Sequence, residues 1–132
     1  MKLGFFSAKQ YDIDHFNRIN QTFGLQIEYF DYRLCMRNVR LAHGFEIICA
    51  FVNDSLSEEV LIELSENGTK VIAMRCAGSN NVDLEAAKKL NLKVVNVPSY
   101  SPESVAEHTV ALMLTLNRKI HKAYQRTRDA NF

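Results

Sequence analysis

The stretch Val94-Val-Asn-Val-Pro-Ser-Tyr-Ser-Pro-Glu-Ser-Val-Ala-Glu-His-Thr-Val-Ala-Leu-Met-Leu-Thr-Leu-Asn-Arg118 determines how the whole chain is interpreted. It begins with the apolar residues of a buried strand and passes through a Pro- and Ser-containing loop. A helix start signal follows, because Ser101 is a favoured N-cap and Pro102 suits the first helical position. Apolar residues then recur at helical spacing, which predicts one long helix over 101–132. If helical to Thr127, it is about 39 Å long, more than one small sheet can cover.

Upstream of this stretch, short apolar runs alternate with segments of helical periodicity. Gly24 is a helix stop signal, and Asp83 is a helix cap. Alternation of this kind predicts a parallel sheet with helices on both faces. Five strands favour a flavodoxin-like doubly wound order in an α/β fold. The expected strands are 2–7, 25–30, 46–51, 70–74 and 92–97; the expected helical segments before residue 101 are 11–23, 34–41, 55–67 and 84–90.

Composition restricts the class of protein. The chain has 132 residues, the size of one domain, and a net charge of +1, which gives no general attraction to nucleic acid or membranes. Its apolar runs are too short to span a bilayer, and no signal peptide is evident. The cysteines, Cys35, Cys49 and Cys76, are odd in number and widely spaced, which argues against disulfides and against a metal site. We therefore expect reduced thiols in a cytoplasmic protein.

Two loops at the carboxyl ends of expected strands are candidates for ligand binding, because open α/β sheets place ligands there. The first is Arg75-Cys-Ala-Gly-Ser-Asn-Asn-Val-Asp83, where free amides near Ala77 and Gly78 could hold an anion. Arg75 would either add charge or brace the loop, and Asp83 suits a helix cap better than an acid catalyst. In the second loop Tyr100 offers a hydroxyl, unless its ring only packs. Most loops of this composition are simply turns.

These two segments resemble a known family. Arg75–Asp83 is similar to the Arg-x-x-Gly-x-x-x-x-Asp loop of the D-isomer-specific 2-hydroxyacid dehydrogenases, and Asn96–Thr109 is similar to their interdomain crossing. The segment from Asn117 to Phe132 is similar to the fermentative D-lactate dehydrogenases within that family. The resemblance implies a substrate-binding domain over residues 1–100 and, over 101–132, an interdomain helix at the start of an NAD-binding domain.

The resemblance also implies roles for particular residues. Amides at Ala77 and Gly78 would hold the carboxylate of a 2-keto acid such as pyruvate, with Arg75 and Asp83 in support. Tyr100 would contact the substrate, and Thr109 would lie near the nicotinamide of NAD.

The family's catalytic His, Arg and Glu, however, match no residue of this chain. Its Gly-x-Gly-x-x-Gly turn is also unmatched, since the chain's five glycines are scattered. We therefore expect the amino-terminal portion of a D-lactate dehydrogenase that is inactive and does not bind NAD by itself.

Other functions fit the sequence less well. A response-regulator receiver would need carboxylates where the first and third strands end, and a flavodoxin would need a phosphate loop after the first strand; neither is present. Glu107 and His108 are neighbours on a helix and point about 100° apart, so they form no acid–base pair. The remaining alternative is a non-catalytic binding or assembly module. In either case we expect a homo-oligomer formed through residues 101–128, because that helix has an uncovered apolar face.

Overall fold

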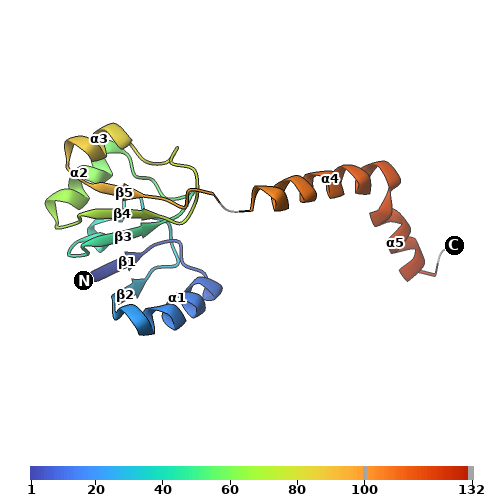
Figure 1. Cartoon of the computed structure of the whole chain (residues 1–132), viewed down its shortest axis with the longest axis horizontal. Coiled ribbons are helices and arrows are strands. Elements are labelled where there is room, and N and C mark those ends of the chain that lie inside the picture. Colours follow the sequence, from blue (N-terminus) through green and yellow to red (C-terminus); the bar gives the residue numbers. More distant parts are fainter. Residues whose placement is uncertain (100, 131–132) are drawn as a thin grey trace. The chain divides into compact units, whose positions relative to one another are not determined.

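The computed structural model describes residues 1–99 and 101–130. The chain divides into two compact units, Met1–Pro98 and Ser99–Phe132, which are considered separately below. Figure 1 shows the elements of each unit with their labels.

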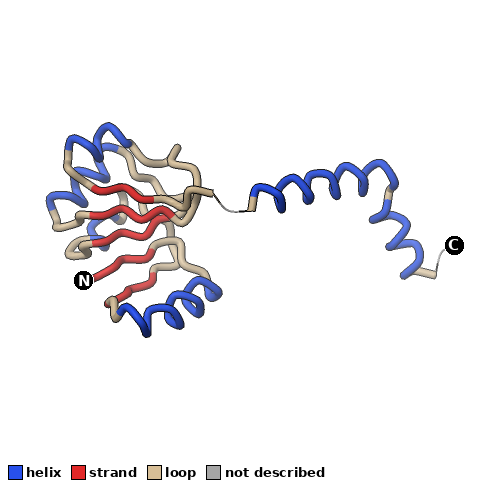
Figure 2. The backbone as a smooth tube through the Cα atoms, in the orientation of Figure 1, coloured by secondary structure: helices blue, strands red, loops and turns tan. Residues whose placement is uncertain are grey.

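The first unit is an α/β domain built on a five-stranded parallel sheet (Figure 2). Its strand order is β2-β1-β3-β4-β5, the flavodoxin-like order predicted from the alternating pattern. Strand β2 therefore lies at an edge, as its alternating sequence indicates. The strands are β1 (Lys2–Phe5), β2 (Gln26–Tyr29), β3 (Ile47–Ala50), β4 (Val71–Met74) and β5 (Lys93–Val95).

Helical segments connect the strands on both sides of the sheet. Side chains of β1 and β3 pack against α1 on one face, with Phe5 and Cys49 buried there. The other face lies under η1, α2 and α3, and it holds the larger core, which includes Ile48 and Ile72. The segments are α1 (Gln10–Phe23), η1 (Val39–Ala42), α2 (Glu58–Glu66) and α3 (Leu84–Lys89).

The helix ends follow the sequence signals. Gly24 ends α1 with a left-handed φ of 65°, and its N–H donates to the Asn20 carbonyl at 2.8 Å. Asp83 is the N-cap of α3, and its Oδ1 accepts a hydrogen bond from the Ala86 N–H at 2.9 Å. Ser57 occupies the N-cap position of α2 but makes no capping bond with its side chain.

The second unit contains two helices where the sequence predicted one. Helix α4 (Pro102–Arg118) begins after Ser101, as expected, and α5 (Ile120–Arg128) follows it. Between them Lys119 has a left-handed φ of 53°, which ends the helical path of α4. None of the residues of α4 or α5 is buried, so the two helices do not cover each other's apolar side chains.

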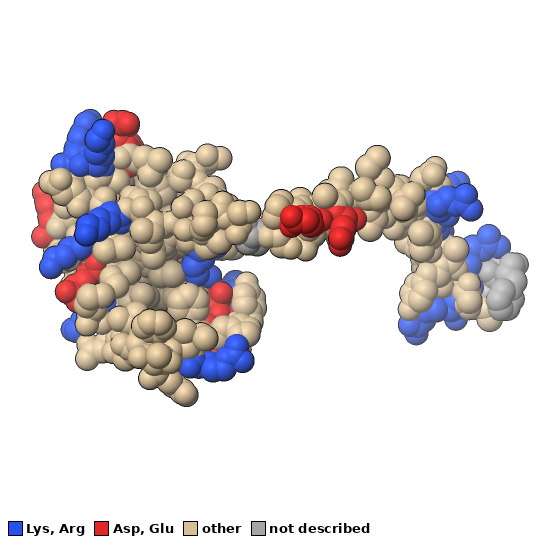
Figure 3. All heavy atoms as spheres, viewed as in Figure 1, with Lys and Arg blue, Asp and Glu red and all other residues tan. Residues whose placement is uncertain are grey.

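Charge is divided along this second unit (Figure 3). The acidic residues of α4, Glu103 and Glu107, lie in its first two turns, whereas Arg118 ends the helix and basic residues predominate in α5. This distribution complements the helix dipole of α4, whose amino end is positive and whose carboxyl end is negative. No helix in the described part of the chain is long and apolar enough to cross a membrane.

The larger core should dominate the stability of the first unit. Leu61 of α2 is 0% exposed, whereas the neighbouring Ile62 on the same helix is 38% exposed. We predict that Leu61→Ala lowers the free energy of unfolding by about 2–5 kcal/mol, because it removes buried methyl groups and leaves a cavity. Ile62→Ala, the matched control, should cost about 1 kcal/mol or less. Urea denaturation measures both, and equal losses would contradict this assignment of the core.

The thiol of Cys49 should make stability depend on pH. Burial raises its pKa from 9.0 to about 12, although the positive charge of Arg75 opposes the rise. Between these pH values the unfolded chain releases the proton and the folded chain retains it, so stability should fall as pH rises. We predict that Cys49→Ala makes this decline shallower in denaturation curves recorded from pH 9 upward. Cys35→Ala, which leaves Cys49 in place, should keep the original slope.

Candidate functional site

The candidate site is formed by the loop from Arg75 to Asp83, which leaves the carboxyl end of β4 and leads into α3. Its middle is exposed at Ala77 and Gly78, whereas Cys76 and Val82 on either side are buried. The buried residues anchor the loop to the core, and the exposed backbone between them faces solvent. The sequence placed the loop at this edge of the sheet, and the structure agrees.

Arg75 braces the loop rather than presenting its charge to a ligand. Its Nη2 donates to the Phe6 carbonyl at 2.7 Å and to the Ser7 carbonyl at 3.2 Å. Its Nη1 forms an ion pair with Asp12 of α1 at 3.1 Å, and the two side chains are only 13% and 12% exposed. The guanidinium also lies over the ring of Phe5, 4.2 Å from its centre. The sequence left open whether Arg75 adds charge to the loop or braces it. These contacts favour the bracing role.

The backbone N–H groups of Ala77 and Gly78 differ from the carbonyls beside them. Their N–H groups donate to no other atom within residues 1–99 and 101–130. The Ala77 carbonyl, in contrast, accepts a hydrogen bond from Asn96 Nδ2 at 2.8 Å, and the Cys76 carbonyl accepts one from the Val97 N–H at 3.2 Å. The carbonyls are thus tied to the segment after β5, while the two neighbouring N–H groups make no hydrogen bond to the described residues.

A hollow of about 300 Å³ lies beside Gly78 and is lined by Val52, Gly78, Asn80 and Asn81. A Cβ added to Gly78 would meet no atom within 4 Å, so the glycine is not needed to fit the loop into the fold. Its φ also lies outside the left-handed region. The absence of a side chain at Gly78 therefore matters only if something approaches the backbone from outside.

The remaining predicted residues lie in different surroundings. Asp83 caps α3 and is engaged there, as expected. Thr109 lies in α4 of the second unit, where its hydroxyl donates to the Val105 carbonyl at 2.8 Å. Tyr100 lies outside the described residues.

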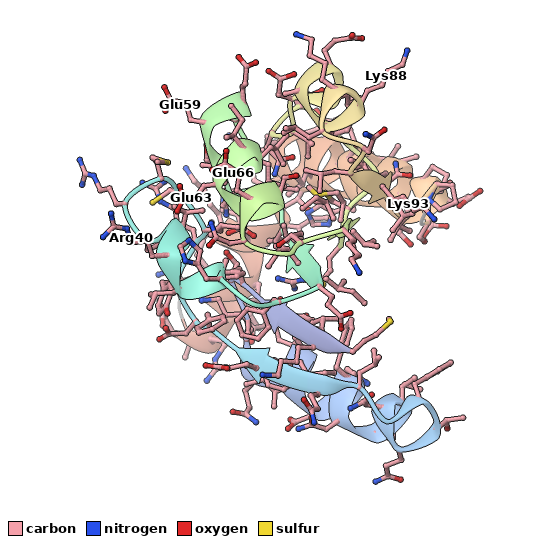
Figure 4. All side chains as sticks on the ribbon, turned by 90° about the vertical axis from the view of Figure 1, so that its left-hand side faces the viewer. Arg40, Glu59, Glu63, Glu66, Lys88 and Lys93 are labelled. Atoms are coloured by element: carbon pink, nitrogen blue, oxygen red, sulfur yellow. The ribbon has the colours of Figure 1, made fainter. Side chains whose placement is uncertain are left out.

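One histidine–carboxylate pair, which the sequence analysis did not foresee, lies elsewhere in the first unit. His43 Nε2 is 2.8 Å from Glu63 Oε1, and the two residues are twenty apart in sequence, so no local pattern joins them. His43 precedes β3, and Glu63 belongs to α2, where Figure 4 labels it beside Glu59 and Glu66. The pair is thus near the amino ends of the strands, opposite the edge where β4 leads into the loop of Gly78. It does not belong to the candidate site.

Sequence reasoning also missed two polar residues that support the loop. Asp54 is almost completely buried just beyond the carboxyl end of β3. Asn81, within the loop itself, donates from its side-chain amide to the carbonyls of Phe51 and Asp54, both at 2.9 Å. For Asp54, the only sequence signal was the polar run Asn53-Asp54-Ser55 after an apolar segment. Such a polar run is equally typical of a solvent-exposed turn, so it did not indicate a buried carboxylate.

Comparison with known proteins relates this geometry to a family. The chain is 57% identical over its whole length to D-lactate dehydrogenase of Escherichia coli and 54% identical to a 2-hydroxyacid dehydrogenase homolog of Haemophilus influenzae. It spans 40% of the length of each of these relatives.

Solved structures agree with the sequence relatives. The apo structure of the Escherichia coli D-lactate dehydrogenase matches the whole chain with a TM-score of 0.87, and the chain covers 42% of it. The Aquifex aeolicus D-lactate dehydrogenase, solved with NAD and lactic acid, matches 98% of the chain with a TM-score of 0.79 and 32% identity; 38% of that structure is covered.

The sequence model of the catalytic domain of the D-isomer specific 2-hydroxyacid dehydrogenases matches residues 4–131. Nearly the whole chain is therefore accounted for by one family. The resemblance inferred from the Arg75–Asp83 and Asn96–Thr109 segments is confirmed, and this chain belongs to the D-isomer specific 2-hydroxyacid dehydrogenases.

Proposed function

We propose that this chain forms the substrate-binding part of an NAD-dependent D-lactate dehydrogenase, which reduces pyruvate with NADH to D-lactate. The observation that carries the proposal is the pair of N–H groups at the exposed residues Ala77 and Gly78, which make no hydrogen bond to the described residues and lie next to an open hollow. Two neighbouring amides suit the carboxylate of a 2-keto acid, because hydrogen bonds to an ionised acceptor are strong. The high identity to the Escherichia coli D-lactate dehydrogenase supports lactate as the product.

The contribution of these residues is binding and orientation. The carboxylate on the Ala77 and Gly78 amides would fix one end of the substrate, and Tyr100 would contact it from the following loop. When NADH is bound, its nicotinamide supplies the hydride for the reduction. Thr109 is proposed to lie near that ring in the assembled enzyme. Arg75 supports the loop and does not bind the substrate, because its guanidinium is already engaged.

The described residues do not include the glycine-rich turn that would hold the dinucleotide itself. NAD is typically held by a Gly-x-Gly-x-x-Gly turn between a strand and a helix. Here Gly24, Gly44 and Gly68 have positive φ at isolated turns, and Gly4 lies inside β1. We therefore propose that a protein of the relatives' length would hold NAD through residues other than these.

The apolar side chains of the second unit suggest how the protein associates. Val105, Leu112 and Leu116 of α4 are more than half exposed. We propose that residues 101–128 form a contact between copies of the chain, since such a face is unfavourable in water. Because Cys35, Cys49 and Cys76 are all free thiols, we also propose a reducing compartment, the cytoplasm.

The proposed activity can be tested by joining this chain to the remaining part of the Escherichia coli relative. We predict that the joined protein oxidises NADH with pyruvate faster than with bulkier 2-keto acids. Absence of turnover with every 2-keto acid would refute the dehydrogenase proposal. A preference for a bulky substrate would refute only the lactate assignment.

Within that joined protein, Gly78→Val should reduce kcat/KM for pyruvate by about tenfold or more, because the new side chain stands where the carboxylate approaches the amides. Gly78→Ala should have a smaller effect. Gly78→Ala should leave the free energy of unfolding within about 1 kcal/mol of the parent value, since the added Cβ meets no atom within 4 Å. Unchanged kinetics in both variants would mean that the loop is purely structural.

The isolated chain provides a further test. We predict no NADH oxidation with pyruvate and no heat on titration with NADH in calorimetry, because the described residues offer neither a dinucleotide turn nor a proton donor at the candidate site. Sedimentation should show dimers or larger species through the face on 101–128. A monomer that binds NADH at micromolar concentration would contradict both expectations.

A further inference from the structure

Asp54 is a buried carboxylate that joins three segments at the carboxyl edge of the sheet. It is 1% exposed. Its Oδ1 accepts hydrogen bonds from Ser7 Oγ and from the Leu34 N–H, both at 2.8 Å, and its Oδ2 accepts one from the Phe51 N–H at 2.6 Å. These donors lie in the segments that follow β1, β2 and β3 respectively, so one side chain holds these three segments together.

The three donors around Asp54 require a side chain that only accepts hydrogen bonds. An ionised carboxylate only accepts, whereas an amide of the same shape places two N–H hydrogens on one side. All three partners of Asp54 are donors. Within the described residues no cation lies within 4.0 Å of Asp54, so its role here is to accept these three bonds.

The bonds close residues 51–54 into a fixed turn. The Asp54 N–H donates to the Phe51 carbonyl at 3.0 Å, while the Phe51 N–H donates to the Asp54 side chain. Val52, between them, is exposed and forms one wall of the hollow beside Gly78. The position of that wall is therefore set by the carboxylate of Asp54.

Asn81 connects the same turn to the loop of Gly78. Its side-chain amide donates to the carbonyls of Phe51 and Asp54, and its own carbonyl accepts from the Leu56 N–H at 2.9 Å. These hydrogen bonds tie the turn to the loop, and Val52 of the turn and Gly78 of the loop both line the hollow.

We propose that Asp54, acting through Asn81, is a positioning residue that fixes the Ala77 and Gly78 amides relative to the Val52 wall. The hollow then keeps the width that suits a 2-keto acid with a small side chain. This inference rests on the proposed function for its substrate, but its structural part is independent of any ligand.

The first experiment compares amide chemical shifts of the ligand-free 132-residue chain by NMR. In Asp54→Asn we expect shifts at Ala77 and Gly78, and exchange of the Leu56 and Asp83 amide hydrogens about tenfold faster than in the parent chain. Leu61→Ala is the matched control, because it weakens the core without touching the turn. If Asp54→Asn does not fold, Asn81→Ala carries the test, since it retains the carboxylate and removes only the link to the loop.

The second experiment adds pyruvate to the same samples. We expect the Ala77 and Gly78 amides of the parent chain to respond, and about tenfold more pyruvate to be needed in Asp54→Asn or Asn81→Ala. Leu61→Ala should respond like the parent chain. An unresponsive parent chain would refute the proposed carboxylate site but not the positioning role, which the ligand-free shifts decide. If the folded variants match Leu61→Ala in shifts and exchange at the loop, the positioning role is wrong.

Discussion

The buried guanidinium of Arg75 is the interaction on which the carboxyl edge of this domain depends. It leaves the end of β4 and reaches the carbonyls of Phe6 and Ser7, which follow β1. It also pairs with Asp12 on α1 and contacts the rings of both Phe5 and Phe51. A planar cation with several donors can join a strand end, a helix and two aromatic rings at once, which a lysine cannot do.

This constraint explains the conformation of Ser7. The residue has a φ of 54°, which is unfavourable for a side chain with a Cβ. Its carbonyl is held by Arg75, and its hydroxyl donates to Asp54. The cation holds the carbonyl of Ser7 and the carboxylate holds its hydroxyl, and the two charged groups form no ion pair with each other within the described residues. The turn after β1 is kept in a strained form because both partners require it there.

Those parts of the fold that depend on local chemistry could be predicted from sequence. The strand order followed from the alternation of strands and helices, and Gly24 and Asp83 were identified from their types and spacing. The break at Lys119 could not be predicted, because Arg118, Lys119 and Ile120 all tolerate a helix.

The supporting contacts of the site depend on residues far apart in sequence. Arg75 meets Phe6 and Asp12, and Asp54 meets Ser7 and Leu34, so their roles emerge only from the folded chain.

The same contacts bear on the carboxylate site that we propose for the loop. Because the charge of Arg75 is used inside the domain, a carboxylate at Ala77 and Gly78 would meet neutral N–H groups. Such groups attract an anion only when they converge on it, since they add no long-range charge. Convergence requires a rigid loop, and the carbonyls of this loop are held by Asn96 and Val97 on one side while Asn81 holds it on the other. In the proposed site, the hydrogen bonds that hold the loop would therefore matter more for binding a carboxylate than a free positive charge.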